Sequence, residues 1–184
     1  MRIISGEFKG RKLASFTGRR IRPTSDRVRE AIFDLLPVEW EGKEIVDLFA
    51  GTGGLGIEAL SRGACRVVFV EHHHQALKVL DKNLIMVNRV ESSEVVRLEV
   101  EEGMKVIKRK GWKFDIAFLD PPYGKGLAGS TIRLVVEHEI MKDRGIVVVE
   151  HHRREVLLEH SPTLKLLDQR NYGKTGLALF VVHS

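Results

Sequence analysis

The sequence has few of the features that mark a secreted, disulfide-stapled or membrane-spanning protein. Its single cysteine, Cys65, cannot form an internal disulfide, and we expect a reducing compartment. The opening residues, MRIISGEFKG, lack the apolar core of a signal peptide, and no apolar run approaches the length of a membrane span. A cytoplasmic protein is therefore expected. A chain of 184 residues buries about 70% of its unfolded surface, so it needs no metal or disulfide for stability.

The chain also lacks internal repeats, low-complexity tracts and linkers, and most of it alternates between two patterns. Short apolar segments predict strands at 44–48, 66–71, 95–100, 114–119 and 145–150. Apolar residues at helical spacing predict helices at 54–62, 75–88, 102–110 and 130–138. Strand–helix alternation of this kind predicts a parallel sheet with helices on both faces.

The last part of the chain follows a different pattern. Two predicted strands, 164–168 and 177–182, are joined by a loop at 172–176 that is too short for a crossover helix. The last strand should therefore be antiparallel to its neighbour. Five parallel strands with a terminal antiparallel hairpin are typical of the Rossmann-like, seven-stranded fold of S-adenosylmethionine-dependent methyltransferases, whereas a dinucleotide-binding sheet has six parallel strands. We expect this α/β fold over residues 38–184.

The basic charge is concentrated in the N-terminal segment. The first 30 residues contain three acidic and nine basic residues. The basic residues are Arg2, Lys9, Arg11, Lys12, Arg19, Arg20, Arg22, Arg27 and Arg29. The rest of the chain has 21 bases and 22 acids. We interpret residues 1–37 as a basic RNA-binding arm, with a small β-hairpin at 2–13 and a helix that starts at Ser25 or Asp26 and is stopped by Pro37.

A glycine-rich segment follows the first predicted strand of the sheet. Gly51, Gly53 and Gly56 fit the G-x-G-x-x-G dinucleotide pattern, with Glu71 twenty residues after Gly51. However, Asp47 ends the strand, and its carboxylate would repel a pyrophosphate. It would attract the ammonium and sulfonium groups of S-adenosylmethionine. We therefore predict that cofactor, with the glycines allowing close backbone approach.

Two further carboxylates are candidates for the nucleoside part of the cofactor. Glu71 ends the second strand, where it can accept the ribose hydroxyls of either cofactor class. Glu102, or Glu101 beside it, follows the third strand and is a candidate acceptor for the adenine amino group. Phe49 and His72, close in the chain to Asp47 and Glu71, are included among the expected cofactor contacts.

The fourth predicted strand leads into Asp120-Pro121-Pro122-Tyr123, which we predict to be catalytic. The prolines fix φ, so Asp120 and a neighbouring carbonyl can accept both N–H groups of a planar amine and aim its lone pair at the methyl donor. Asp120 also stabilises the positive nitrogen as the bond forms, and Tyr123 can stack on the base. Adenine N6, guanine N2 and cytosine N4 all suit this site, and a base within a helix must first be extruded.

Six segments together resemble the bacterial small-subunit ribosomal RNA guanine-N2 methyltransferases of the RsmD type. They are Arg2-Ile-Ile-Ser-Gly6, Gly10-Arg-Lys-Leu13, Ile21-Arg-Pro-Thr-Ser-Asp-Arg-Val-Arg-Glu-Ala31, Asp47 to Gly56, Asp120 to Tyr123 and Tyr172-Gly-Lys-Thr175. The resemblance implies methylation of one guanine N2 in 16S RNA, within an assembled or partly assembled 30S subunit. A DNA adenine-N6 methyltransferase and a non-catalytic RNA-binding assembly factor are the alternatives.

The resemblance also implies roles for particular residues. Asp47, Gly51, Gly53 and Glu71 would hold the cofactor, and Asp120 to Tyr123 would hold the guanine. Arg22, Thr24 and Arg27 would lie beside the cofactor or the RNA entrance. We count Thr24 among the cofactor contacts. From the basic charge of the arm, the expected RNA contacts are Lys12, Arg19, Arg20, Arg22 and Arg27. Two features depart from the family pattern: Glu102, where Asp is more usual, and the triplet His72-His73-His74. No metal site is expected there, because adjacent side chains on an extended chain diverge.

Overall fold

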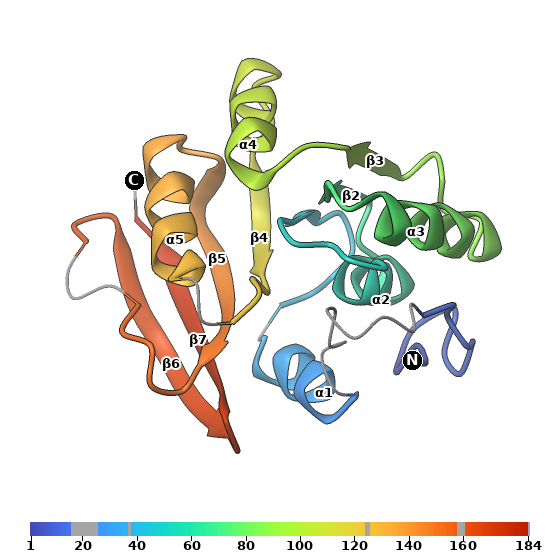
Figure 1. Ribbon diagram of the computed structural model, residues 1–184, viewed down its shortest axis with the longest axis horizontal. Helices are drawn as coiled ribbons and strands as arrows, with labels where there is room; N and C mark the ends of the chain where they lie inside the picture. Colours follow the sequence, from blue (N-terminus) through green and yellow to red (C-terminus); the bar gives the residue numbers. More distant parts are fainter. Residues whose placement is uncertain (16–25, 37, 124–125, 158–160, 184) are drawn as a thin grey trace.

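Figure 1 shows the computed structural model of the chain, in which helices cover both sides of one twisted sheet. The structure describes residues 1–15, 26–36, 38–123, 126–157 and 161–183. Within these residues seven strands lie in the order β3-β2-β1-β4-β5-β7-β6. In chain order the strands are Glu44–Asp47 (β1), Arg66–Val70 (β2), Ser93–Val96 (β3), Phe114–Leu119 (β4), Met141–His152 (β5), Leu164–Tyr172 (β6) and Thr175–Val182 (β7).

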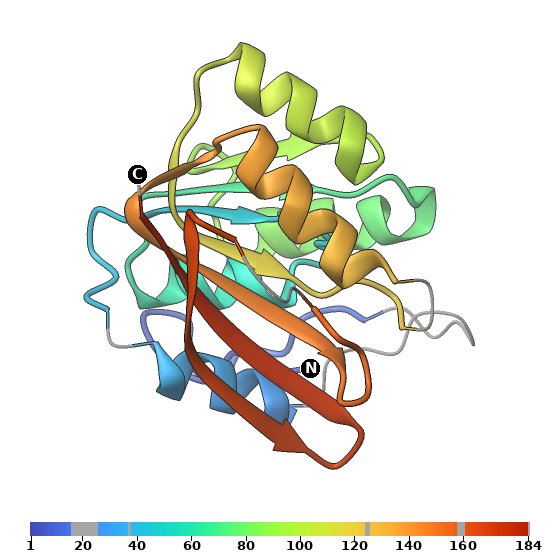
Figure 2. The same ribbon diagram turned by 90° about the vertical axis from the view of Figure 1, so that its left-hand side faces the viewer.

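The strand directions confirm the predicted fold. Each neighbouring pair from β3 to β5 is parallel, and β7 runs antiparallel to both β5 and β6. The hairpin therefore does more than close the edge of the sheet, because its second strand lies between β5 and its first strand. Figure 2 shows β6 and β7 extending the sheet beyond β5.

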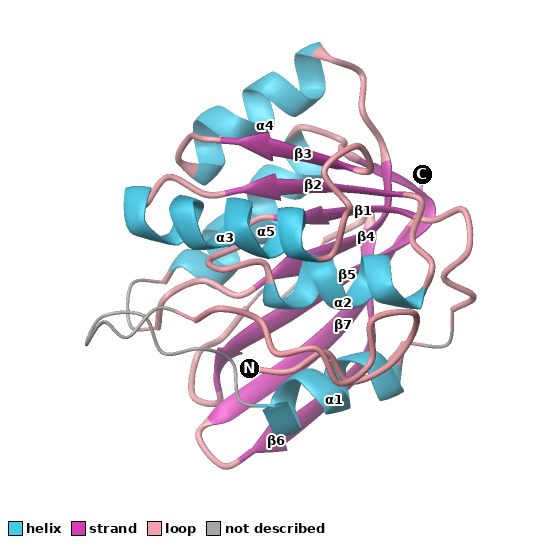
Figure 3. Ribbon diagram, turned by 90° about the vertical axis from the view of Figure 1, so that its right-hand side faces the viewer, coloured by secondary structure: helices cyan, strands magenta, loops and turns pink. Residues whose placement is uncertain are grey.

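Five helices in the described residues cover the two faces of the sheet. They are Asp26–Leu35 (α1), Gly54–Arg62 (α2), His74–Met86 (α3), Val100–Arg109 (α4) and Leu127–Glu137 (α5). Helices α1, α2 and α3 pack on one face and α4 and α5 on the other, as Figure 3 shows. Successive strand residues alternate between the two cores: Ile45 belongs to the first and Val46 to the second. This alternation follows from the two-residue period of a strand.

The element boundaries differ from the predictions at the edge strands β3 and β6, and at β5, which begins at Met141 rather than residue 145. Strand β3 ends at Val96 rather than residue 100, and α4 begins at Val100, so Glu101 and Glu102 lie in its first turn. Strand β6 runs to Tyr172, well beyond the predicted end at residue 168. Both are edge strands with much exposed surface, so their sequences carry little apolar alternation.

The predicted N-terminal hairpin forms only in part. Residues 2–13 reverse direction, with one isolated β-bridge between Arg2 and Lys12. Backbone hydrogen bonds also cross the turn, from the Ile3 and Leu13 amides to the Arg11 and Met1 carbonyls at 3.0 and 3.1 Å. The segment is held by the body of the protein as well. The Glu58 carboxylate of α2 accepts hydrogen bonds from the Ile4 and Ser5 amides at 2.7 and 2.9 Å. These bonds to α2 add to the few cross-strand bonds of the short hairpin.

The end of this N-terminal segment is tied to the glycine-rich turn through one buried residue. Asn83 of α3 is completely buried. Its Oδ1 accepts the Ala14 amide at 2.8 Å, while its Nδ2 donates to the carbonyls of Ala14 and Thr52 at 3.1 and 2.9 Å. Ala14 is therefore fixed beside the turn. Separately, no helix in the described part of the chain is long and apolar enough to cross a bilayer.

Candidate active site

Three of the predicted site carboxylates lie along one edge of the sheet. Asp47 is the last residue of β1, Glu71 follows β2 and Asp120 follows β4. These three strands are parallel neighbours in the order β2-β1-β4, so their carboxyl ends point to the same edge. Ligands of open α/β sheets bind outside the carboxyl ends of the strands. This edge is therefore the candidate active site.

The glycine-rich turn connects β1 to α2 at this edge. Gly53 has φ +86°, and an added Cβ would lie 2.5 Å from Cδ1 of Leu80, so a side chain there would strain the backbone and displace Leu80. Gly51 has φ +53°, and the nearest atom to an added Cβ is the Phe49 carbonyl at 4.0 Å, which leaves open space beside it. Helix α2 has no side-chain cap and no acid in its first turn. Of the amides in its first turn, the Gly56 amide donates to Asp47.

Asp47 is a buried carboxylate with one incompletely satisfied oxygen. It is 1% exposed, and its Oδ2 accepts the Gly56 amide at 3.1 Å. Its Oδ1 is buried, and no hydrogen-bond partner is recorded for it. Burial is the main cause that raises the pKa of Asp47 to about 7, and the nearby Glu71 adds to it, whereas the backbone amides of Gly56 and Phe49 oppose it. Burying the ionised carboxylate costs free energy, and a donor or a cation bound at Oδ1 would offset much of that cost.

Glu71 is already held by three backbone amides. Its Oε2 accepts the Gly51 amide at 2.8 Å, and its Oε1 accepts the amides of His72 and His73 at 2.8 and 2.7 Å. A carboxylate offers about four acceptor positions, so one remains for a ribose hydroxyl. These bonds also connect the turn after β1 with the turn after β2.

The residues predicted to lie near the adenine are more exposed. His72 places Nε2 3.2 Å from Oε1 of Glu99, the residue that precedes α4. Glu102 is 58% exposed and pairs with Lys105 at 2.6 Å, and Glu101 is 64% exposed and 3.6 Å from the same lysine. Neither glutamate is held as firmly as Glu71. Phe49 is half-buried against the second core.

The predicted catalytic tetrapeptide leaves the sheet directly after β4. Asp120 is half-buried, Pro121 is buried and Pro122 is exposed. Tyr123 is 39% exposed, yet its hydroxyl is fixed on two sides. It donates to Oε1 of Glu150 at 2.6 Å and lies 2.8 Å from Oγ1 of Thr175. The end of the tetrapeptide is thus tied to both β5 and β7.

Sequence reasoning missed Glu150 as a site residue. It lies near the end of β5, which is parallel to β4, and it is only 6% exposed. A carboxylate close to the end of an otherwise apolar predicted strand is a signal that could have identified it. Thr175 was noticed only as part of a resemblance, because nothing local in the sequence reveals that a hairpin turn brings it to Tyr123.

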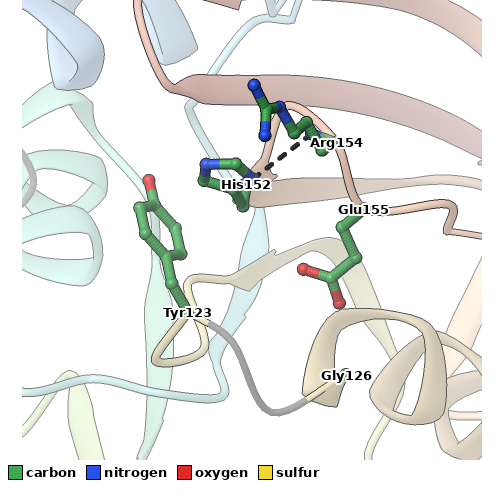
Figure 4. Close-up of a pocket in the computed structure, with 5 residues that line it drawn as sticks. All are labelled: Tyr123, Gly126, His152, Arg154 and Glu155. Carbon is green, nitrogen blue, oxygen red and sulfur yellow. Dashed lines mark hydrogen bonds between the residues drawn. The ribbon is translucent and has the colours of Figure 1, made fainter.

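A hollow of about 450 Å³ lies beside Tyr123. It is lined by Tyr123, Gly126, His152, Arg154 and Glu155. Figure 4 shows Tyr123 on one side and Glu155 with Gly126 on the other. The Tyr123 and His152 rings meet edge to face, with centroids 6.1 Å apart. His152 accepts the Arg154 amide through Nδ1 at 3.3 Å, so a neutral imidazole carries its proton on Nε2.

Only part of the predicted RNA-binding set can be located. Lys12 and Arg27 are exposed. Arg19, Arg20, Arg22 and Thr24 lie outside the described residues. In the described part of the chain, no group of three or more His, Cys, Asp or Glu side chains is arranged to hold a metal ion.

The geometry of this edge fits the predicted cofactor. The buried Asp47 Oδ1 suits a cationic ammonium, and the open side of Gly51 leaves room for an extended ligand. Glu71 lies after the neighbouring strand and retains an acceptor position for a hydroxyl. An anionic pyrophosphate would instead face two carboxylates.

Comparison with known proteins agrees with this geometry. The family described as "Conserved hypothetical protein 95" matches residues 1–181. The "Putative rRNA methyltransferase YlbH" of Bacillus subtilis is 36% identical over 180 residues, which is 98% of each chain. The "Ribosomal RNA small subunit methyltransferase D" of Haemophilus influenzae is 36% identical over 181 residues, covering 98% of this chain and 93% of that protein.

A solved structure shows the same similarity in three dimensions. The structure of the "Putative methyltransferase yhhF from Escherichia coli" superposes with a TM-score of 0.86 and 32% sequence identity. The match covers 100% of this chain and 98% of that one. The similarity therefore includes the N-terminal segment as well as the sheet.

Proposed function

The chain belongs to the family described as conserved hypothetical protein 95, together with the small-subunit rRNA methyltransferases D, and on this premise we propose that it methylates the N2 amine of one guanine in 16S ribosomal RNA. Its cofactor is S-adenosylmethionine, as in methyltransferases of this fold. The observation that carries the proposal is the tetrapeptide after β4, which lies at the same sheet edge as Asp47 and Glu71.

S-adenosylmethionine supplies an electrophilic methyl group on a sulfonium. The residues of the chain bind and orient the reactants. Asp47 would face the ammonium of the cofactor, Gly51 and Gly53 would let the backbone approach it, and Glu71 would accept from the ribose. Phe49, His72, Glu102 and Thr24 are proposed to complete the cofactor site.

Asp120 would act on the guanine. Its carboxylate and a carbonyl of the rigid Pro121-Pro122 segment would accept the two N–H groups of the exocyclic amine. The nitrogen lone pair is then directed toward the methyl group for in-line displacement. As the nitrogen gains positive charge and becomes acidic, Asp120 stabilises the charge. The hollow beside Tyr123 would receive the extruded base.

The basic N-terminal arm supports an RNA substrate. Residues 1–37 would form a unit that packs on the methyltransferase domain at 38–184, and its apolar residues Ile3, Leu13 and Ile32 share the core of that domain. Lys12, Arg19, Arg20, Arg22 and Arg27 would neutralise phosphates. We propose that the substrate is an assembled or partly assembled 30S subunit and that the protein acts in the cytoplasm, where these subunits are made.

The proposal is tested by methyl transfer to 30S subunits from cells that lack the corresponding gene. Radiolabelled methyl groups should be incorporated, and nucleoside analysis of the digested RNA should identify N2-methylguanosine at one position. N6-methyladenosine in duplex DNA would support an adenine methyltransferase instead. Tight subunit binding without transfer would indicate a non-catalytic assembly factor. Either result would contradict the proposal.

Neutralising the arm should weaken RNA binding in a salt-dependent way. Replacing Arg19, Arg20 and Arg22 with glutamine removes three phosphate contacts and the counterions that each would release. We expect the slope of log K against log salt to become shallower by roughly 2 to 3 units. Filter binding or anisotropy from 50 to 300 mM salt measures it.

The matched control for the arm is a triple variant on α4, which packs on the face of the sheet opposite to α1. Lys105, Lys108 and Arg109 of α4 should be replaced with glutamine in the same way. Their replacement should leave the slope unchanged. Equal slopes for the arm variant and the wild type would show that the arm does not contact the RNA backbone.

A further inference from the structure

Tyr123 is exposed enough to meet a ligand, yet its hydroxyl is not free to move. The hydroxyl has one proton, and at 2.6 Å from Oε1 of Glu150 that proton is donated to the carboxylate. At the 2.8 Å contact with Thr175, the threonine hydroxyl is then the donor. The phenolic oxygen is thereby fixed from two directions. Two fixed contacts at the tip of the ring leave little freedom for the ring itself.

The two partners come from different strands. Glu150 lies on β5 opposite Leu177 of β7, and Thr175 lies on β7 opposite His152 of β5. Glu150 and His152, two residues apart on one strand, point to the same face. Their side chains and that of Thr175 therefore form a diagonal cluster on neighbouring strands. Because strands of a packed sheet are rigid, the cluster is a firm anchor for a loop residue.

Burial removes water from the Glu150 carboxylate, which is unfavourable. It is 6% exposed, and burying an ionised carboxylate is costly unless hydrogen bonds compensate. Burial and the bond to Glu150 also raise the pKa of Tyr123, while the bond from Thr175 lowers it. An apolar contact would be enough to hold the end of the loop in place. A hydrogen bond from the partly exposed Tyr123 to a buried carboxylate also fixes the direction of the tyrosine side chain.

We propose that Glu150 and Thr175 are positioning residues, which clamp Tyr123 so that its ring forms a fixed wall for the base that is methylated. This inference rests on the proposed function, since it assigns a task within the same site. Tyr123 is the residue of the tetrapeptide that lines the hollow of about 450 Å³. A wall that is already fixed costs no ordering when the base binds. It also holds the base in line for transfer.

The test compares variants that release the clamp with variants that keep it. Tyr123→Phe removes the hydroxyl and keeps the ring, and Thr175→Val removes the donor and keeps the shape. Each should lower kcat/KM for methyl transfer about tenfold, because a misplacement of about 1 Å can cost about 100-fold. Thr175→Ser should restore most of the activity. Binding of S-adenosylhomocysteine should stay within about twofold in all of them.

A double variant separates positioning from general stability. In Tyr123→Phe protein the clamp is already absent, so adding Thr175→Val should lower kcat/KM no further. If the two changes multiply, or if the losses in kcat/KM follow the losses in thermal stability, the residues are merely structural and the proposal is overturned. Tyr172→Phe is the matched control on the same hairpin and should leave kcat/KM unchanged.

Ultraviolet titration tests the clamp without any substrate. The chain has two tyrosines, Tyr123 and Tyr172, so Tyr172→Phe leaves only Tyr123 to titrate. In that background, Glu150→Gln should let Tyr123 ionise at a lower pH, because the charge that opposes phenolate formation is gone. Unchanged titration would overturn the clamp. Wild-type protein that titrates as expected but transfers no methyl group would contradict the proposed function and not the clamp geometry.

Discussion

Replacing Asp120 with alanine should lower the rate of methyl transfer by on the order of 10²–10³-fold or more, while S-adenosylhomocysteine binds with an affinity within a few fold of wild type. The carboxylate is proposed to orient the amine and to stabilise the charge that appears on its nitrogen. Both effects act in the transition state, so the loss should fall on kcat rather than on cofactor binding. Single-turnover transfer and calorimetric titration measure the two quantities.

The control for this prediction lies on the same strand. Asp115 lies near the start of β4, at the end of the strand opposite to Asp120, where it pairs with Lys142 at 2.8 Å. Asp115→Asn should transfer methyl groups at the wild-type rate, although the lost ion pair can lower the melting temperature. If Asp120→Ala retained more than a tenth of the wild-type rate, the carboxylate would not have the proposed role. Equal losses in the two variants would point to a general structural effect.

Replacing Asp47 with asparagine should have opposite effects on stability and on cofactor affinity. The folded-state pKa is raised from 3.8 to about 7, so ionised Asp47 costs about 4 kcal/mol of unfolding free energy at most. Because the pKa is raised on folding, the unfolding free energy is highest below about pH 4, where Asp47 is protonated in both states. It falls as the pH rises through about 7 and Asp47 ionises in the folded protein. Asp47→Asn should therefore raise the melting temperature of the cofactor-free protein at pH 8 more than at pH 5.

The same change should weaken cofactor binding by on the order of 10- to 100-fold, because a charge-assisted hydrogen bond to the ammonium is lost. Wild-type affinity should also rise roughly tenfold or more between pH 5.5 and 7.5 as Asp47 ionises, whereas Asp47→Asn should show no such rise. Calorimetric titration at several pH values measures both. Glu44→Gln, at the other end of β1, is the control. A pH-independent affinity in the wild type would contradict the role of Asp47.

The sheet and the three strand-end carboxylates could be predicted because their signals are local. The strand before Asp47 is a short apolar run, and Asp120 follows another, so each carboxylate marks a strand end in the sequence itself. Parallel strands then bring both to one edge. The glycines after Asp47 predict a tight turn for the same reason, since Gly53 has a backbone conformation that other residues rarely adopt.

The remaining features depend on contacts between distant residues. The N-terminal segment is tied to the body because Glu58, 53 or 54 residues later in the chain, accepts the Ile4 and Ser5 amides. The clamp joins Tyr123 to Glu150, 27 positions later in the chain, and to Thr175, 52 positions later. Neither contact has a periodic signal. The start of β6 was predicted, but its extension from residue 168 to Tyr172 was not, because that part of the edge strand is largely exposed and has no apolar pattern.

The position of β7 also sets the order in which the protein can fold during its synthesis. β7 is the last of the seven strands to leave the ribosome, yet it lies inside the sheet, between β5 and β6. Domains fold as the chain emerges from its N-terminus, so β1 to β4 and the glycine turn can assemble while β7 is still being made. A nascent chain that stops before Thr175 has the cofactor turn but lacks the inner strand and the hydroxyl that holds Tyr123.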